Sequence, residues 1–320
     1  MKLGIMIEGQ EGLTLDRWRH IGAAVEALGY ESLWRSDHFR SLMGTERASP
    51  ETWVTLTQTA LETRRLRFGP LVSPMTFRHP SLLVRMAATV DQLSGGRLVL
   101  GVGAGWNEPE HRAYGIPFPP VRRRMEMLEE AVEVILRLQA DGPATFEGKH
   151  YQLDGAVMEP KPAQRPHIKL LIGGSGERRT LPLVARHADE WNMTSATAER
   201  FRAKSTVLDD HCRAIGRNPA EIERSIMTGF LIGGGETELR RRVEVMQRVI
   251  PRLAQMDTSE VPAAMQQAGW LTGTPDQVVA SLRALADVGV HRVMLQHLAQ
   301  EDDAVLELIA REVMPAVAGS

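Results

Sequence analysis

Short apolar runs and amphipathic stretches alternate along the chain of 320 residues. The apolar runs have the β-branched and aliphatic character of buried strands, and the stretches between them carry apolar residues at the spacing of one helical face. Eight strands are predicted, at residues 3–7, 31–34, 66–72, 97–103, 169–172, 190–193, 226–232 and 292–296. This repetition predicts an α/β protein with a (β/α)8 TIM barrel, an architecture that typically takes about 250 residues plus insertions.

Two segments interrupt the repeat, and we interpret them as insertions after strands 4 and 7 of a single domain that spans residues 1–320. In residues 140–168, polar and apolar residues alternate on either side of Gly148, which predicts a small hairpin followed by a proline-rich connector. Residues 233–273 are predominantly helical and are not needed by a minimal barrel. We expect them to form a lid over the site.

The fourth predicted strand continues into the run R-L-V-L-G-V-G-A-G-W-N-E-P-E. Gly101, Gly103 and Gly105 leave one side of it bare, which indicates close approach of a flat ligand or of another backbone. A crowded barrel interior where only glycine fits would give the same pattern. A dinucleotide fingerprint is rejected, because Trp106 takes the place of its last glycine and a proline-containing loop follows where a helix should begin.

Candidate catalytic residues follow the second and fourth strands, and the loops after the strands of a barrel share one face. Asp37 and His38 follow the second strand, whereas Glu108 and Glu110 follow the fourth. A histidine beside an aspartate can exchange protons near neutral pH, although the pair would equally suit a helix cap with a solvated histidine. Glu108 and Glu110 could in the same way be surface carboxylates.

A glycine loop after the fifth strand is the best candidate for binding an anion. Its N–H groups and the following helix N-terminus would face a phosphate. Arg178 and Arg179 follow in the predicted first turn, where a cation opposes the helix dipole and is best explained by an anionic ligand. A sharp flexible turn is the alternative. The loop comprises Gly173, Gly174, Ser175 and Gly176.

Composition and absent motifs exclude several classes of protein. The net charge of -2 gives no reason to expect a nucleic acid or a membrane surface as partner, and no apolar stretch approaches a membrane span. The single cysteine, Cys212, allows no intrachain disulfide and fits a cytoplasmic location. No cluster has metal-ligand spacing and no G-x-S-x-G elbow occurs, so we expect an enzyme that acts on a small-molecule substrate without a metal.

Several motifs together resemble the luciferase-like monooxygenase superfamily over nearly the whole chain. They are F-R-H-P, D-Q-L-S-G-G-R-L-V-L-G-V-G-A-G-W-N-E-P-E-H, P-K-P-A-Q-R-P, I-G-G-S-G-E-R-R-T-L and G-T-P. Within that superfamily, S-D-H-F and Y-G-I-P-F-P-P resemble the branch of coenzyme F420-dependent oxidoreductases. Relatives are often dimers, so a homodimer is one expected state.

The resemblance implies a barrel that holds a deazaflavin or flavin. Its phosphate would lie on the loop of Gly174 to Gly176, and its ring against the ends of the third and fourth strands, with a non-proline cis peptide near Val72-Ser73. Asp37 and His38 match the acidic residue and histidine beside the reactive ring carbon, and Glu108 or Glu110 loosely matches a proton-donating carboxylate. The cofactor-binding residues implied in this way are Asp37, Val72, Ser73, Gly103, Gly105, Trp106, Gly173, Gly174, Ser175, Gly176 and Arg178.

We therefore predict a coenzyme F420-dependent oxidoreductase that transfers a hydride between the deazaflavin and a small organic substrate. His38 would donate or accept a proton, and Asp37 would orient His38 or the ring. Arg178, Arg179 and Lys161 would contact the anionic tail of the cofactor. An FMN-dependent luciferase-like monooxygenase is the alternative, and a non-catalytic flavin-binding barrel is the alternative of another class.

Overall fold

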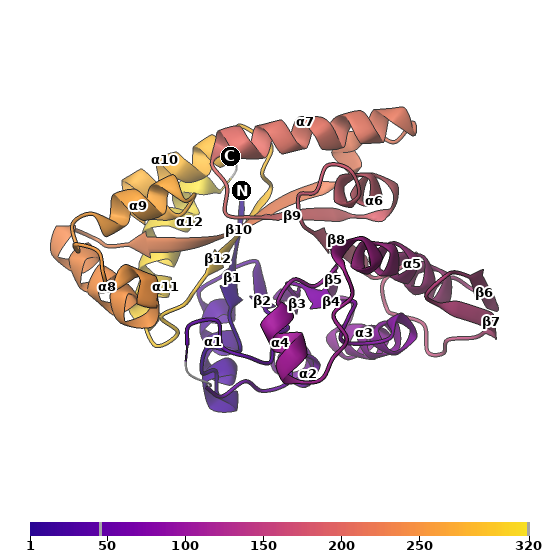
Figure 1. The fold of residues 1–320 in the computed structure, drawn as a ribbon. Coiled ribbons are helices and arrows are strands. Elements are labelled where there is room, and N and C mark those ends of the chain that lie inside the picture. The colour runs from indigo at the N-terminus through magenta and orange to yellow at the C-terminus, as the bar shows by residue number, and fades with distance from the viewer. Residues whose placement is uncertain (45–46, 319–320) are drawn as a thin grey trace.

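The computed structural model describes residues 1–44 and 47–318, and its main sheet is a nearly closed barrel of parallel strands surrounded by helices (Figure 1). Around the sheet the strands follow the order β3-β2-β1-β12-β10-β9-β8-β5-β4, and a bridge between Phe68 of β3 and Leu98, just before β5, closes the ring. The predicted (β/α)8 TIM barrel is confirmed. Its strands are β1 (Lys2–Ile7), β2 (Ser32–Arg35), β3 (Arg67–Pro70), β4 (Ser73–Pro74), β5 (Val99–Gly103), β8 (Lys169–Gly173), β9 (Glu190–Thr194), β10 (Glu223–Ile232) and β12 (Arg292–Gln296).

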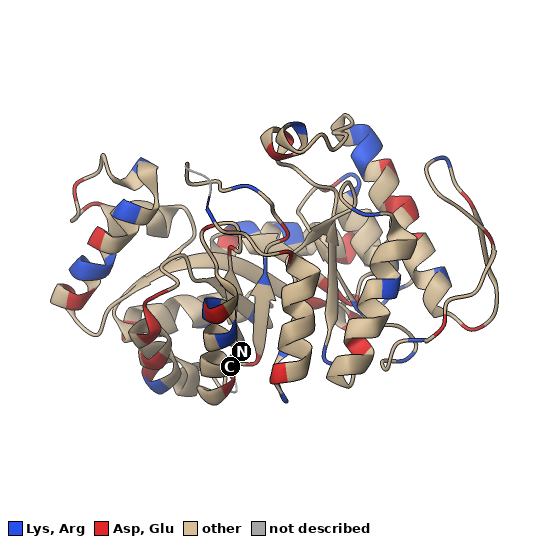
Figure 2. Ribbon diagram, turned by 90° about the horizontal axis from the view of Figure 1, so that it is seen from below, with Lys and Arg blue, Asp and Glu red and all other residues tan. Residues whose placement is uncertain are grey.

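The helices cover the outside of the barrel and begin at recognisable caps. Thr14 accepts a hydrogen bond from the backbone of Arg17 at the start of α1, and Thr274 and Gln277 form a capping box at α10. Charged residues of both signs are interspersed on the outer helices (Figure 2). The helices are α1 (Leu15–Ala27), α2 (Thr52–Glu62), α3 (Pro80–Ser94), α4 (Glu108–Ala113), α5 (Val121–Gln139), α6 (Thr180–His187), α7 (Ala198–Ala214), α8 (Glu236–Val249), α9 (Val261–Gln267), α10 (Pro275–Ala286), α11 (Asp303–Leu308) and α12 (Met314–Val317).

Both predicted insertions contain the expected kinds of element, with one addition. The first holds an antiparallel hairpin of β6 (Ala144–Glu147) and β7 (Gln152–Ala156). The second holds α8, a short 3-10 turn (Pro251–Leu253) and α9, and then β11 (Leu271–Gly273), which pairs in parallel with β10. β11 was not predicted, because a strand of three residues is too short to show a periodicity.

Two further details differ from the predictions. The third barrel strand is split into β3 and β4, and the cis peptide lies at Leu71-Val72, one bond before the predicted position. The loop after β5 contains α4, where the sequence pattern predicted no helix. It forms because Asn107 caps it and because proline is tolerated in a first helical turn, where its missing N–H has no partner to lose.

Side chains fill the interior of the barrel between its N-terminal end and its C-terminal rim. Met6, Trp34, Val99, Leu171 and Met294 pack together inside it. At the N-terminal end, the buried guanidinium of Arg292 pairs with Glu31, Glu190 and Glu223. The interior is therefore a packed core, and the C-terminal rim is the end at which a ligand could enter. Within the described ranges, no helix is both long and apolar enough to span a membrane.

Candidate active site

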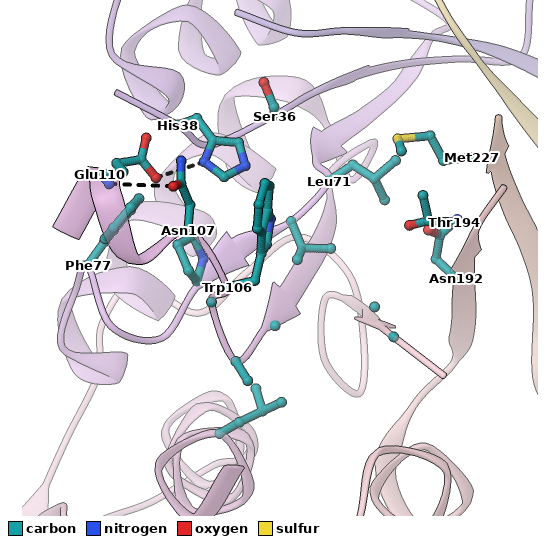
Figure 3. Close-up of a pocket in the computed structure, with 18 of the residues that line it drawn as sticks. Ser36, His38, Leu71, Phe77, Trp106, Asn107, Glu110, Asn192, Thr194 and Met227 are labelled. Atoms are coloured by element: carbon teal, nitrogen blue, oxygen red, sulfur yellow. Dashed lines mark hydrogen bonds and ion pairs between the residues drawn. The ribbon is translucent and has the colours of Figure 1, made fainter. Parts of the chain in front are cut away.

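A cavity of about 550 Å³ opens at the C-terminal ends of the strands (Figure 3). Seven of the eight barrel strands contribute residues at or near their C-terminal ends, or in the loops that follow, to its wall, and β10 contributes a residue from its middle. These are Met6 and Glu8, Ser36 and His38, Leu71, Val72 and Pro74, Gly103, Gly105, Trp106 and Asn107, Gly173 and Gly174, Asn192 and Thr194, Met227, and Gln296. This is the face on which barrel enzymes carry their chemistry.

His38 and Glu110 form a hydrogen-bonded pair on one wall of the cavity (Figure 3). Nδ1 of His38 lies 2.8 Å from Oε2 of Glu110, whose side chain is fully buried. The other carboxylate oxygen of Glu110 accepts hydrogen bonds from the backbone N–H groups of Phe39 and Arg40. Both oxygens are thus used, and the pair is fixed in place.

Electrostatics favour the charged form of both partners. Burial lowers the pKa of His38, but the hydrogen bond and the negative charge of Glu110 outweigh it, so that the pKa lies above its ordinary value. Burial raises the pKa of Glu110, but the hydrogen bond and charge of His38 and two backbone N–H groups bring it below its ordinary value. The imidazole is therefore well suited to hold a proton near neutral pH.

Asp37 was predicted to orient His38 or the ring, and it does not hydrogen-bond to His38. Its carboxylate is buried and accepts hydrogen bonds from Ser73 and from the guanidinium of Arg78, which also pairs with Glu51. Neither Asp37 nor Ser73 lies on the cavity wall. The two residues form a layer behind the wall, and the carboxylate that orients His38 is Glu110.

Glu108 and Trp106 lie on the outer side of the site. Glu108 is an exposed residue in the first turn of α4 and does not line the cavity. Trp106 does line it, remains 63% exposed, and meets His38 edge to face with ring centroids 5.6 Å apart. The structure thus brings Glu110, and not Glu108, to the histidine.

The bare glycines of the fourth barrel strand have a packing explanation. A Cβ added at Gly101 would lie 2.1 Å from the carbonyl oxygen of Pro70, and one at Gly103 would lie 2.6 Å from Cγ2 of Val72. A Cβ at Gly173 would lie 3.1 Å from Cγ1 of Val72. Gly103 and Gly173 therefore make the hollow that holds Val72, whose other side faces the cavity. At Gly101 the close neighbour is another backbone, as one of the predicted options required, and at Gly103 it is the side chain of Val72.

The predicted phosphate loop is only partly on the cavity wall. Gly173 and Gly174 line the cavity together with Thr180, whereas Ser175 and Gly176 continue toward the N-terminus of α6. Gly174 has a φ of +124°, a conformation that L side chains rarely adopt. The loop is thus shaped by glycine at the point where it meets the cavity.

The three predicted tail-binding cations lie in different surroundings. Arg178 is exposed, and Arg179 precedes α6 and pairs with Glu129. Both lie before the first helical turn, not in it. Lys161 is buried and donates hydrogen bonds to the carbonyl oxygens of Leu138 and Ala140 at the end of α5, so its predicted contact with a cofactor tail is wrong.

Comparison with known proteins identifies the family. The family model described as luciferase-like monooxygenase matches residues 1–292. The chain belongs to the luciferase-like monooxygenase family. It is 25% identical over 305 residues to an F420-dependent glucose-6-phosphate dehydrogenase of Kineococcus radiotolerans, a match that covers 91% of this chain and 89% of that protein.

Other members of the luciferase-like family differ in the cofactor that they are named for. The chain is 25% identical over 345 residues to the FMNH(2)-dependent dimethylsulfone monooxygenase of Pseudomonas putida, covering 97% of this chain and 90% of that protein. Among solved structures, an F420-dependent secondary alcohol dehydrogenase in complex with an F420-acetone adduct has the same fold, with a TM-score of 0.81, 19% identity and coverage of 99% and 98%. The chain is therefore an enzyme of this oxidoreductase class.

Several cavity residues of this family member were not found from the sequence. They are Glu8, Asn192, Thr194, Met227 and Gln296. Gln296 is a polar residue that ends β12 after the apolar run Val293 to Leu295, and that pattern is the signal that could have located it. Asn192 lies between Trp191 and Met193 in the middle of β9, where nothing in the sequence marks it as a cavity residue. The predicted lid also differs: residues 233–273 contribute nothing to the cavity wall just described, and only Ile250, Pro251, Arg252 and Trp270 reach the adjoining space.

Proposed function

We propose that the protein is a coenzyme F420-dependent oxidoreductase that transfers a hydride between the deazaflavin and a small organic substrate. The observation that carries this proposal is the His38–Glu110 pair on the wall of a cavity shaped by Val72 and the glycine loop. When bound, the cofactor would supply the hydride chemistry, and the protein would supply position and protons. The residues fit such a group, because Gly173 and Gly174 present backbone to an anion and Val72 offers an apolar support for a flat ring.

His38 is the proton carrier in this proposal. Its Nδ1 is engaged by Glu110, and within the part of the chain that the structure describes Nε2 makes no hydrogen bond. Nε2 can therefore exchange a proton with a substrate oxygen, donating it when the substrate is reduced and accepting it when the substrate is oxidised. Glu110 holds the ring in one orientation and stabilises its charged form.

A basic groove next to the glycine loop favours coenzyme F420 over FMN. We define the basic groove as the hollow of about 530 Å³ lined by Pro120, Arg122, Arg123, Glu126, Lys149 and His150. Arg179, at the end of the glycine loop, donates a hydrogen bond to the carbonyl oxygen of Arg122, so the groove adjoins the loop. FMN ends at its phosphate, whereas the glutamyl tail of coenzyme F420 carries further carboxylates that could reach these cations.

Glu126 is the one carboxylate among the described residues that line the groove, and it is engaged by the groove's own cations. Hydrogen bonds from Lys149 and His150 bring its pKa to about 2. Arg123 is exposed and forms no ion pair with any residue in the ranges 1–44 and 47–318. The groove thus retains cationic groups that can contact a tail.

Fluorescence titration of the protein with coenzyme F420 and with FMN tests the proposal. We expect tighter binding of coenzyme F420, weakened several-fold by Arg123→Glu and by added salt. Arg241→Glu, which makes the same charge change on an exposed site of α8, should have no effect. Tighter binding of FMN at equal ionic strength would favour the monooxygenase alternative, and absence of turnover with either cofactor would favour a non-catalytic barrel.

A further inference from the structure

The active-site cavity continues into a second space that the proposed function does not use. Four residues, Leu42, Thr194, Met227 and Gln296, line both. We call the second space the side chamber; it has a volume of about 530 Å³. Its remaining lining residues are Met43, Ser195, Ile250, Pro251, Arg252, Trp270 and Leu298.

The wall of the side chamber is mainly hydrocarbon. Ile250, Trp270 and Leu298 belong to a hydrophobic core that the second insertion forms with β10 and with the loop after β12, and Met43 packs against this core. Arg252 is exposed and is the only charged residue among the lining residues that the structure describes. Burial of apolar surface would favour the binding of an apolar ligand here. An anion such as a phosphate would lose its hydration and find a single cation, Arg252, at the edge.

Trp270 is held in a fixed position in this wall. A Cβ added at Gly229 of β10 would lie 2.2 Å from Cε2 of the Trp270 ring, so the absence of a side chain at that position makes room for the indole. The carbonyl oxygen of the neighbouring Gly269 accepts a hydrogen bond of 2.7 Å from the hydroxyl of Thr228. These contacts fix the ring against β10 and leave its other side toward the chamber.

We propose that the side chamber binds the body of the substrate and that this substrate is an uncharged, largely hydrocarbon molecule. The inference rests on the proposed function, because the reacting carbon has to lie in the active-site cavity within reach of His38. A proton carrier at that position is suited to a substrate whose reacting carbon bears an oxygen. The substrate class is therefore an apolar alcohol or carbonyl compound and not a sugar phosphate.

Binding of a homologous series to the cofactor-loaded protein tests this inference. The probes are 1-butanol, 1-hexanol and 1-octanol, with octanoate and glucose 6-phosphate as charged comparisons, and dissociation constants are measured by calorimetry. We expect affinity to rise about threefold to fourfold per methylene, the increment for full burial of a CH2 group. No dependence on chain length, or tighter binding of octanoate or glucose 6-phosphate than of 1-octanol, would overturn the proposal.

Variants locate the binding in the side chamber. Gly229→Ala should push the Trp270 ring away from β10 and into the chamber, and lower the affinity for 1-octanol at least fivefold. The matched control is Gly235→Ala at the start of the second insertion, where an added Cβ has no atom within 4 Å. Equal affinities of the two variants for 1-octanol would overturn the assignment.

The measurements also separate this inference from the proposed function. Each protein is first titrated with coenzyme F420, and neither variant should change that affinity, since no cofactor-binding residue is altered. The wild-type protein is then tested with and without cofactor. Failure to bind coenzyme F420 would refute the proposed function, whereas normal cofactor binding with no preference for longer alkanols would refute only the side-chamber assignment.

Discussion

The carboxylate of Glu110 accepts hydrogen bonds from two backbone N–H groups and stabilises the charged imidazole of His38, and replacing Glu110 by glutamine separates these two functions. The amide oxygen of the new side chain can still accept the hydrogen bonds that Phe39 and Arg40 donate to Oε1, so the local backbone should remain in place. The amide NH2 would then face Nδ1 of His38, where Oε2 lies 2.8 Å away in the native protein. A donor at that position cannot accept a proton from Nδ1 and disfavours the charged imidazole.

The size of the effect follows from the pair that is lost. A hydrogen bond to a charged group contributes about 1.5–3 kcal/mol, and one pKa unit corresponds to about 1.4 kcal/mol. Both side chains are largely or fully buried, so solvent screens the interaction little. The pKa of His38, which lies above its ordinary value in the native protein, should therefore fall in Glu110→Gln, by an amount that corresponds to this hydrogen-bond energy.

The sign of the pH dependence follows from the raised pKa. In the native protein the pair is fully stabilising below the ordinary pKa of histidine, and this contribution is lost as pH rises through the raised pKa of His38. In Glu110→Gln the loss of stability on titration of His38 should occur at lower pH. The limb of the pH-rate profile that reports His38 should move to lower pH as well. His38→Ala should remove that limb and lower turnover by about 10² to 10⁴-fold, with a much smaller change in cofactor affinity.

The assay is the pH dependence of kcat/KM for wild type, Glu110→Gln and the control Glu108→Gln. Glu108 is two residues away, exposed and absent from the cavity wall, so its variant should reproduce the wild-type profile. An equal displacement in both variants would show that the limb does not report the His38–Glu110 pair. An unshifted profile in Glu110→Gln, with the protein folded, would refute the reasoning altogether.

Three further predictions follow from other parts of the molecule. Gly174→Asp should weaken cofactor binding at least tenfold, because it puts a negative charge and a strained φ at the glycine loop; unchanged affinity in a titration would contradict the phosphate assignment. Gly103→Ala should lower the free energy of unfolding by about 1–3 kcal/mol, because its Cβ would collide with Val72; a denaturant titration measures this loss. Burial brings the pKa of His297 to about 4. As the pH falls from 7 to about 4.5, this histidine binds a proton in the unfolded chain but not yet in the folded chain, so the free energy of unfolding should fall by about 2–3 kcal/mol. The variant His297→Asn should lose less stability over the same range.

The sequence predicted the barrel well because each barrel strand repeats the same physical pattern, an apolar run followed by an amphipathic helix. It could not choose between Glu108 and Glu110, because the choice depends on α4. Successive residues of a helix are about 100° apart, so two residues separated by one position point in nearly opposite directions. Once Asn107 caps α4, Glu110 turns inward to His38 and Glu108 turns to solvent.

The parts of the site that the sequence revealed and the parts that it hid differ in their physical origin. Gly103 and Gly174 could be picked out from the sequence because each glycine has a local cause. Gly103 makes room for the side chain of Val72, and Gly174 lets the backbone adopt a positive φ. Trp270 is invisible as a site residue, because its position depends on the fit of its ring to Gly229, which lies far earlier in the chain. Contacts of this long-range kind leave no periodicity or spacing, and in this protein they shape the space beside the barrel rim.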